Sequence, residues 1–175
     1  MLILRKSYIK LLLLIVLSVA LNACKSAKKT TSKTPKTTKT TTANKTVNPV
    51  AISLIQEAKT YEGVKYKYGG TNRKGMDCSG LLYTVFQTEG IALARSSSEI
   101  ANQGEWIDIK EVQPGDLVFF ATAKNSRNIN HVGLVTGTRN GHIEFIHSST
   151  SQGVITSSLA ERYWYFAYVQ ARRLL

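Results

Sequence analysis

An abrupt change of composition near residue 49 limits where this chain can build a hydrophobic core. Residues 1–49 carry ten Lys and Arg and no Asp or Glu, whereas residues 50–175 carry thirteen Lys and Arg against eleven Asp and Glu. The net charge of +12 therefore lies almost entirely in the first part, and the second part has only +2. We expect one folded domain of about 125 residues, a common domain size. A nucleic-acid-binding domain would carry its own basic surface, so we expect no nucleic acid as a partner.

Residues 1–23 have the pattern of a bacterial signal peptide. Lys and Arg precede an apolar run over residues 11–21, which is shorter than the roughly 20 residues of a transmembrane helix. The sequence Leu21-Asn22-Ala23-Cys24 resembles the bacterial lipobox, in which the cysteine is lipidated. We expect a lipid on Cys24 to hold the chain on a membrane. An Asp directly after the lipidated cysteine would favour retention in the inner membrane. Lys25 occupies this position, so we expect the chain to be anchored in the outer membrane, facing the periplasm. A buried helix with a chance cysteine, or an uncleaved anchor, is the alternative.

Residues 24–49 are predicted to be a disordered linker that begins at the lipidated cysteine. Seven Lys and nine Thr dominate residues 25–49, and no aromatic residue occurs there. Such a segment buries too little apolar area to offset its ordering entropy. Because its charges repel one another, we expect an extended spacer.

Residues 50–175 show helical periodicity first and strand patterns second. Helices are predicted over 50–61 and 78–89, and a Ser96–Glu99 capping box starts a short helix that ends at Gln103. Strands are predicted over 117–121, 131–136, 142–147 and 166–172, with a helical turn within 158–164. Asn140-Gly141 is typical of a hairpin turn. This order indicates an α+β domain in which N-terminal helices pack on an antiparallel β-sheet.

Cys78 is the first candidate for chemistry. The chain has two cysteines, which excludes a disulfide-rich scaffold, and no Cys or His spacing typical of a zinc site occurs. Cys78 opens a predicted helix, where free N–H groups and the helix dipole would lower the pKa of its thiol. The negative charge of Asp77 would act against this effect. The alternative is a small buried apolar side chain.

The three histidines can supply a base for this thiol. His131 opens one predicted strand and His147 ends the next, whereas His142 falls on the opposite face and is interpreted as a surface residue. A cysteine nucleophile needs a base, and the base needs an orienting partner. His131 and His147 could fill these two roles if the start of the 78–89 helix lies over the hairpin.

Five motifs together resemble one known family. They are Tyr66-Lys-Tyr-Gly-Gly-Thr71, Met76-Asp-Cys-Ser-Gly-Leu81, Pro114-Gly-Asp-Leu117, His131-Val-Gly-Leu134 and Phe145-Ile-His-Ser-Ser149. Their combination resembles the NlpC family of papain-like cell-wall cysteine peptidases over residues 50–175. The stretch after Val154 is similar to the lipoprotein murein endopeptidases of enteric bacteria within that family. The resemblance implies a papain-like α+β fold, with Cys78 as nucleophile, His131 as base and His147 as its orienting residue.

The resemblance also implies the substrate and its contacts. Tyr66 would line the site and assist the oxyanion or the substrate amine, and Asp77, Ser79 and Arg95 would contact the peptide. Ala94 stands where the family often has Pro, and the 137–142 hairpin is longer than in the enteric subgroup. We expect these two differences to change the shape of the substrate-binding groove.

The reaction implied is hydrolysis of murein peptides without metal or cofactor, by a chain that we expect to be monomeric. The bond is γ-D-glutamyl to diamino acid within a stem, or D-Ala to diamino acid in a cross-link. Two other functions stay open: a wall-binding module that has lost catalysis, and an amidase or acyltransferase that uses the same Cys and His residues.

Overall fold

The computed structural model describes residues 48–139 and 141–175. The predicted signal peptide, Cys24, nearly all of the predicted linker and Asn140 of the hairpin lie outside these residues. No helix within the described ranges is long and apolar enough to cross a membrane.

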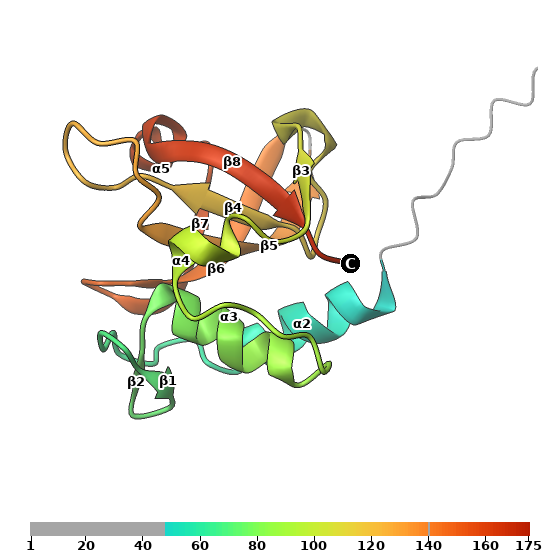
Figure 1. Ribbon diagram of the computed structural model, residues 1–175, viewed down its shortest axis with the longest axis vertical. Coiled ribbons are helices and arrows are strands. Elements are labelled where there is room, and N and C mark those ends of the chain that lie inside the picture. The colour runs from blue at the N-terminus through green and yellow to red at the C-terminus, as the bar shows by residue number, and fades with distance from the viewer. Residues whose placement is uncertain (1–47, 140) are drawn as a thin grey trace, which may run out of the picture. The chain divides into compact units, whose positions relative to one another are not determined.

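Helices precede most of the sheet in chain order, as predicted (Figure 1). The helices are α2 (Pro49–Lys59), α3 (Cys78–Gln87), α4 (Ser97–Ile100), the 3-10 helix η1 (Ile109–Glu111) and α5 (Arg162–Ala167). The strands are β1 (Thr71–Asn72), β2 (Gly75–Met76), β3 (Glu105–Ile107), β4 (Leu117–Phe120), β5 (His131–Arg139), β6 (His142–Ser149), β7 (Gly153–Ser158) and β8 (Tyr168–Arg173). The expected α+β class, with N-terminal helices on an antiparallel sheet, is confirmed.

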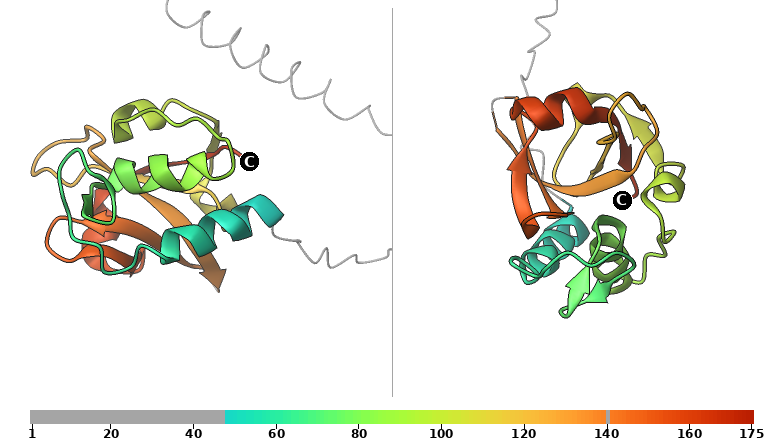
Figure 2. Two further views of the ribbon diagram at one scale, coloured as in Figure 1. Left: turned by 90° about the horizontal axis from the view of Figure 1, so that it is seen from below. Right: turned by 90° about the vertical axis from the view of Figure 1, so that its left-hand side faces the viewer.

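Six strands form one antiparallel sheet in the order β3-β8-β4-β5-β6-β7, and β1 and β2 form a separate small hairpin. The sheet curves, with α2 and α3 beneath one face and α5 at the other side, as the right-hand view of Figure 2 shows. Each face therefore has its own apolar layer.

Strand β4 explains the two layers. All four of its side chains are buried. Leu117 and Phe119 pack into the layer that includes α2 and α3, whereas Val118 and Phe120 pack into the layer that includes α5. Successive side chains of a strand point to opposite faces, so a strand covered on both sides reads as a continuous apolar run.

Several elements differ from the prediction. Strands β1, β2, β3 and β7 were not predicted, α5 begins later than the turn expected within 158–164, and β8 begins at Tyr168 rather than Phe166. Gly153–Ser158 is rich in Ser and Thr, and only its pairing with β6 makes it a strand. Tertiary contacts thus override a weak local pattern.

Candidate active site

Asp77 starts α3 and thereby fixes the position of Cys78. The Asp77 side chain accepts a hydrogen bond from the backbone N–H of Gly80 at 2.6 Å, which is a helix N-cap. Gly80 lies so close to the preceding loop that a Cβ there would come within 2.0 Å of the Gly70 carbonyl oxygen. The sequence Asp-Cys-Ser-Gly therefore starts the helix and allows the loop to approach it closely.

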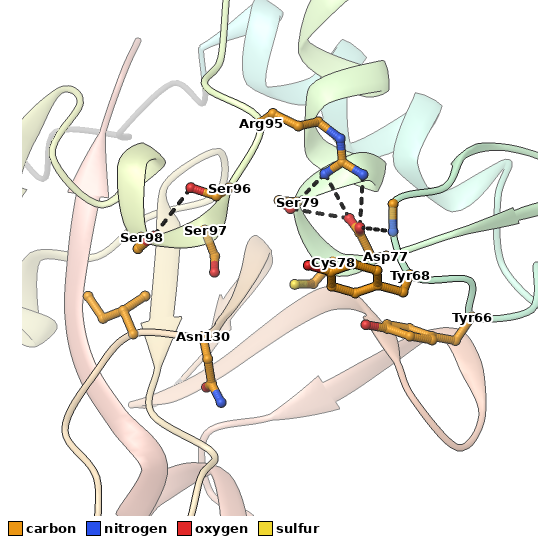
Figure 3. A pocket seen from close by; sticks show the side chains of 12 residues that line it. Tyr66, Tyr68, Asp77, Cys78, Ser79, Arg95, Ser96, Ser97, Ser98 and Asn130 are labelled. Carbon is orange, nitrogen blue, oxygen red and sulfur yellow. Dashed lines mark hydrogen bonds and ion pairs between the residues drawn. The ribbon is translucent and has the colours of Figure 1, made fainter.

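Asp77 also joins Arg95 to the start of α3 (Figure 3). Arg95 donates to the two carboxylate oxygens at 3.0 and 2.8 Å and to the Ser79 hydroxyl at 2.9 Å. The backbone N–H of Gly69 donates to Asp77 at 2.7 Å. Burial tends to raise the pKa of Asp77, but the hydrogen bonds from Arg95, Gly80 and Gly69 outweigh it and hold this pKa below its usual value.

The carboxylate of Asp77 thus accepts five hydrogen bonds from the protein, the fifth from Ser79 at 3.2 Å. A carboxylate offers about four lone-pair positions, so these oxygens have no free position for a substrate. We infer that Asp77 positions its neighbours, and that Arg95 is the member of this ion pair that faces a ligand, since its side chain is 39% exposed.

Cys78 lies on the wall of a cavity of about 430 Å³ (Figure 3). The cavity is also lined by Tyr66, Asp77, Ser79 and Arg95, so the structure brings together all the residues predicted to contact substrate. Its wall also includes residues that were not predicted to contact substrate: Tyr68, Ser96, Ser97, Ser98, Ile129 and Asn130. Ser97 and Ser98 come from α4 and the others from the segments between regular elements, and the tertiary fold brings them to the cavity.

Burial raises the pKa of the Cys78 thiol, which corrects the expected net lowering. The residue is only 8% exposed. The backbone N–H groups of Val132, Ser79 and Cys78 itself lower this pKa, as expected at a helix start, but desolvation is the larger effect and Asp77 adds to it. The contact with Val132 places the thiol beside the first residues of β5, where His131 lies.

Tyr66 stands close to the same thiol. Burial is the main cause that raises the pKa of its hydroxyl, and the nearby charges of Cys78 and Asp77 raise it further. The phenol therefore remains protonated and able to donate a hydrogen bond. Tyr68, by contrast, is 88% exposed and stands on the rim of the cavity.

The two predicted histidines form a buried relay with a third residue. His131 Nε2 lies 2.9 Å from His147 Nδ1, and His147 Nε2 lies 3.1 Å from the Ser157 hydroxyl. Trp164 stacks on the His131 ring at 5.3 Å between centroids. Ser157 and Trp164 were not predicted for the site, because no sequence signal placed β7 beside β6 or α5 over the histidines.

Both histidines are neutral at pH 7. Burial lowers the pKa of His131 to about 4, and burial together with the charge of His131 lowers that of His147 to about 3. Burial is the first cause both of the raised pKa of the Cys78 thiol and of the lowered pKa of His131, so desolvation favours the neutral form of each group. His142 is exposed at the start of β6 and takes no part in the relay.

Within the described ranges, no group of three or more His, Cys, Asp or Glu side chains is placed to hold a metal ion. The chemistry that this geometry can offer is acyl transfer, because a thiol on the wall of a cavity contacts Val132, the neighbour of the buried imidazole of His131.

Comparison with known proteins supports this interpretation. The model of the NlpC/P60 family matches residues 63–173. The chain is 43% identical over 114 residues to the probable endopeptidase NlpC homolog of Haemophilus influenzae, covering 65% of this chain and 57% of that protein. It is 37% identical over 123 residues to the murein DD-endopeptidase MepS/murein LD-carboxypeptidase of Escherichia coli, covering 70% and 62% respectively.

A solved structure of an NlpC/P60 family protein from Bacillus cereus superposes with a TM-score of 0.64 at 32% identity, over 73% of this chain and 41% of that one. The match therefore spans about three fifths of the two curated relatives and less than half of the solved one.

Proposed function

The chain belongs to the NlpC/P60 family, and from this premise we propose that it hydrolyses amide bonds in the peptide stems or cross-links of peptidoglycan. The observation that carries the proposal is the position of Cys78. It lies at the N-terminus of α3, on the wall of a cavity, beside the strand that begins with His131. Such a cysteine is suited to nucleophilic catalysis. A cysteine that served only to fill the core would not require a hydrogen-bonded relay of His131, His147 and Ser157 on the neighbouring strands.

The relay allows one proton arrangement in which His131 can act as a base. If His131 Nδ1 accepts the thiol proton, the neutral ring carries its proton on Nε2 and donates it to His147 Nδ1. His147 then donates from Nε2 to Ser157. Ser157 as an acceptor therefore favours the productive tautomer of His131.

In the proposed reaction, the sulfur of Cys78 attacks the substrate carbonyl carbon as its proton passes to His131. The backbone N–H of Cys78 and the hydroxyl of Tyr66 are the donors available to the developing oxyanion. His131 then gives its proton to the leaving amine, and a thioester remains. Water, deprotonated by His131, attacks the thioester carbon. The C–S bond then breaks, the acid leaves, and the proton on His131 returns to the Cys78 sulfur.

Cell-envelope attachment is part of the proposal. We infer that residues 1–23 are removed, that a lipid on Cys24 anchors the chain to the outer membrane facing the periplasm, and that residues 25–49 let the domain reach the wall. The lipobox-like sequence and the basic, Thr-rich linker support this inference. We expect a monomer with peptidoglycan peptides as its partner.

The test is digestion of purified sacculi and defined muropeptides by the full-length chain, with products resolved by liquid chromatography and mass spectrometry. We expect new amine and carboxyl termini in stem peptides or cross-links. Cys78→Ser should abolish them, and the matched variant Cys24→Ser should not. An unchanged substrate with a folded wild-type chain would favour the wall-binding module. Products in which the acyl group is joined to an acceptor other than water would favour the acyltransferase.

A further inference from the structure

The outer side of α5 carries three exposed aromatic rings, on the side of the sheet away from α2 and α3 (Figure 2). Tyr163, Tyr165 and Phe166 are between 59% and 68% exposed, whereas Trp164, among them in the chain, is buried. Aromatic rings that gather on one exposed face are typical of a surface that binds a partner. We call these three residues the outer α5 surface.

A cavity of about 590 Å³ lies beside this surface. Tyr165, Phe166 and Tyr168 line it together with aliphatic side chains of β6 and the segment before α5. Phe166 and Tyr163 also line a second hollow on the other flank of α5, so the surface continues around the helix. The volume lies in the range of small-molecule sites. Cys78 lines neither hollow, so both are separate from the cavity of the proposed nucleophile.

The polar side chains of the 590 Å³ cavity supply hydrogen-bond donors. Arg127 lines it and donates one N–H to the Tyr168 carbonyl at 3.3 Å, which holds the guanidinium in place and leaves further N–H groups for a ligand. Burial, and after it the charge of Asp108, raises the pKa of Tyr168 to about 12, so its phenol also remains a donor. Among the described residues that line this cavity, none bears a carboxylate. The matching ligand has apolar faces and hydrogen-bond acceptors along its edges.

Trp164 connects the outer α5 surface to the proposed base. Its ring stacks on His131 at 5.3 Å between centroids, and it belongs to the same six-residue helix as the exposed rings. Such a helix is about 9 Å long. In peptidoglycan, two to four stem residues separate the sugar from the two candidate bonds, which is roughly 7–14 Å of extended chain. The sugar that carries the stem can therefore reach this surface while the peptide occupies the site.

Resting on the proposed function, we propose that the outer α5 surface and the adjoining 590 Å³ cavity bind the glycan strand to which the stem peptide is attached. An N-acetylhexosamine ring presents C–H groups on its faces, and their partial positive charge suits the negative faces of Tyr165 and Phe166. Its N-acetyl carbonyl and its ring oxygens accept hydrogen bonds, for which Arg127 and Tyr168 are the donors. A sugar ring enters a hollow, whereas a flat lipid surface does not, so the cavity favours the glycan over a membrane.

Binding is tested by NMR titration of the full-length chain with a tetrasaccharide of alternating GlcNAc and MurNAc. Its lactyl carboxyl groups are converted to methylamides, as the stem amidates them, so that no free carboxylate attracts Arg127. We expect the wild-type chain to bind it, and the double variant Tyr165→Ala/Phe166→Ala to bind about tenfold more weakly, because two stacking faces are lost. The matched control Trp106→Ala removes an equally exposed ring of β3 that lines neither hollow, and should leave binding unchanged.

Hydrolysis provides the second readout. We expect kcat/KM of the wild-type chain to be about tenfold higher for a stem peptide attached to the disaccharide than for the free stem peptide. The double variant should lose this preference and keep its rate on the free peptide, which also shows that it is folded. Binding of the tetrasaccharide by a chain that cuts neither peptide supports the surface and counts against the proposed function alone.

Three results would overturn the proposal, whatever the hydrolysis shows. One is a wild-type chain that does not bind the tetrasaccharide, and another is undiminished binding by the folded double variant. The third is a double variant that loses binding only to vesicles of anionic phospholipid, which would make the outer α5 surface a membrane contact.

Discussion

Two buried neutral histidines should make the stability of this domain depend on pH in a range where few other groups titrate. The usual pKa of 6.5 applies to the unfolded chain, whereas burial lowers that of His131 to about 4 and that of His147 to about 3 in the fold. Below pH 6.5 the unfolded chain therefore binds more protons than the folded one. Stability is fully present above about pH 7 and falls as the pH falls toward 4.

The size of the effect follows from these values. At pH 5 the unfolded chain gains about 2 kcal/mol from each histidine, so the free energy of unfolding should drop by roughly 4 kcal/mol between pH 7.5 and 5. Domains of this kind have only about 5–15 kcal/mol in total. Asp77 does not blur the result, because its lowered pKa affects stability only at more acid pH.

The assay is urea denaturation of the full-length chain at the two pH values and one ionic strength, followed by tryptophan fluorescence, since Trp164 packs on both histidines. His147→Asn should halve the pH-dependent loss, whatever its effect at pH 7.5. His142→Asn, at an exposed position, should leave the loss unchanged. A wild-type chain that loses less than about 1 kcal/mol, or an unaltered loss in His147→Asn, would refute the reasoning.

Three further predictions concern the positions of the proposed catalytic groups. In Arg95→Lys, the lysine cannot bridge both oxygens of Asp77. We expect the free energy of unfolding in urea to fall by about 1 kcal/mol, a small loss because Arg95 is partly exposed. The KM for stem peptides should increase as well. Ser157→Ala should lower kcat about tenfold with little change in KM, and Ser157→Thr should restore part of it, because the acceptor for His147 returns. Gly80→Ala would place its Cβ 2.0 Å from the Gly70 carbonyl oxygen. This should lower the free energy of unfolding by roughly 2–4 kcal/mol in the same melts and abolish most of the hydrolytic activity.

Much of the fold could be predicted from local patterns. The apolar spacing of α2 and α3, the capping box of α4 and the continuous apolar run of β4 are strong local signals, and each appears where expected. β7 and α5 could not be placed in the same way. β7 is defined by its pairing with β6, and the six residues of α5 are helical while most of their aromatic side chains stay exposed.

The residues of the candidate site also fall into two groups, those predicted from local sequence and those placed only by the tertiary fold. Cys78, His131 and His147 were predicted from residue type and motif, and the structure places them at one end of α3, β5 and β6. Ser157 and Trp164 carry no motif of their own, and their roles arise from strand pairing and ring stacking. The direction of the Cys78 pKa shift was predicted wrongly, because a helix start is visible in the sequence and the depth of burial is not.

The site lies where the two apolar layers of the domain meet. Cys78 packs with α2 and α3 in one layer, and Trp164, which holds His131, packs in the other. Strand β5 contributes Val132 to the first layer and Val135 to the second, so the core fixes the proposed base, His131, relative to the proposed nucleophile, Cys78. Desolvation favours the neutral form of both groups there. In the proposed reaction, proton transfer from Cys78 to His131 is therefore driven by the substrate, whose developing oxyanion would accept the Tyr66 and backbone donors when a carbonyl occupies the cavity.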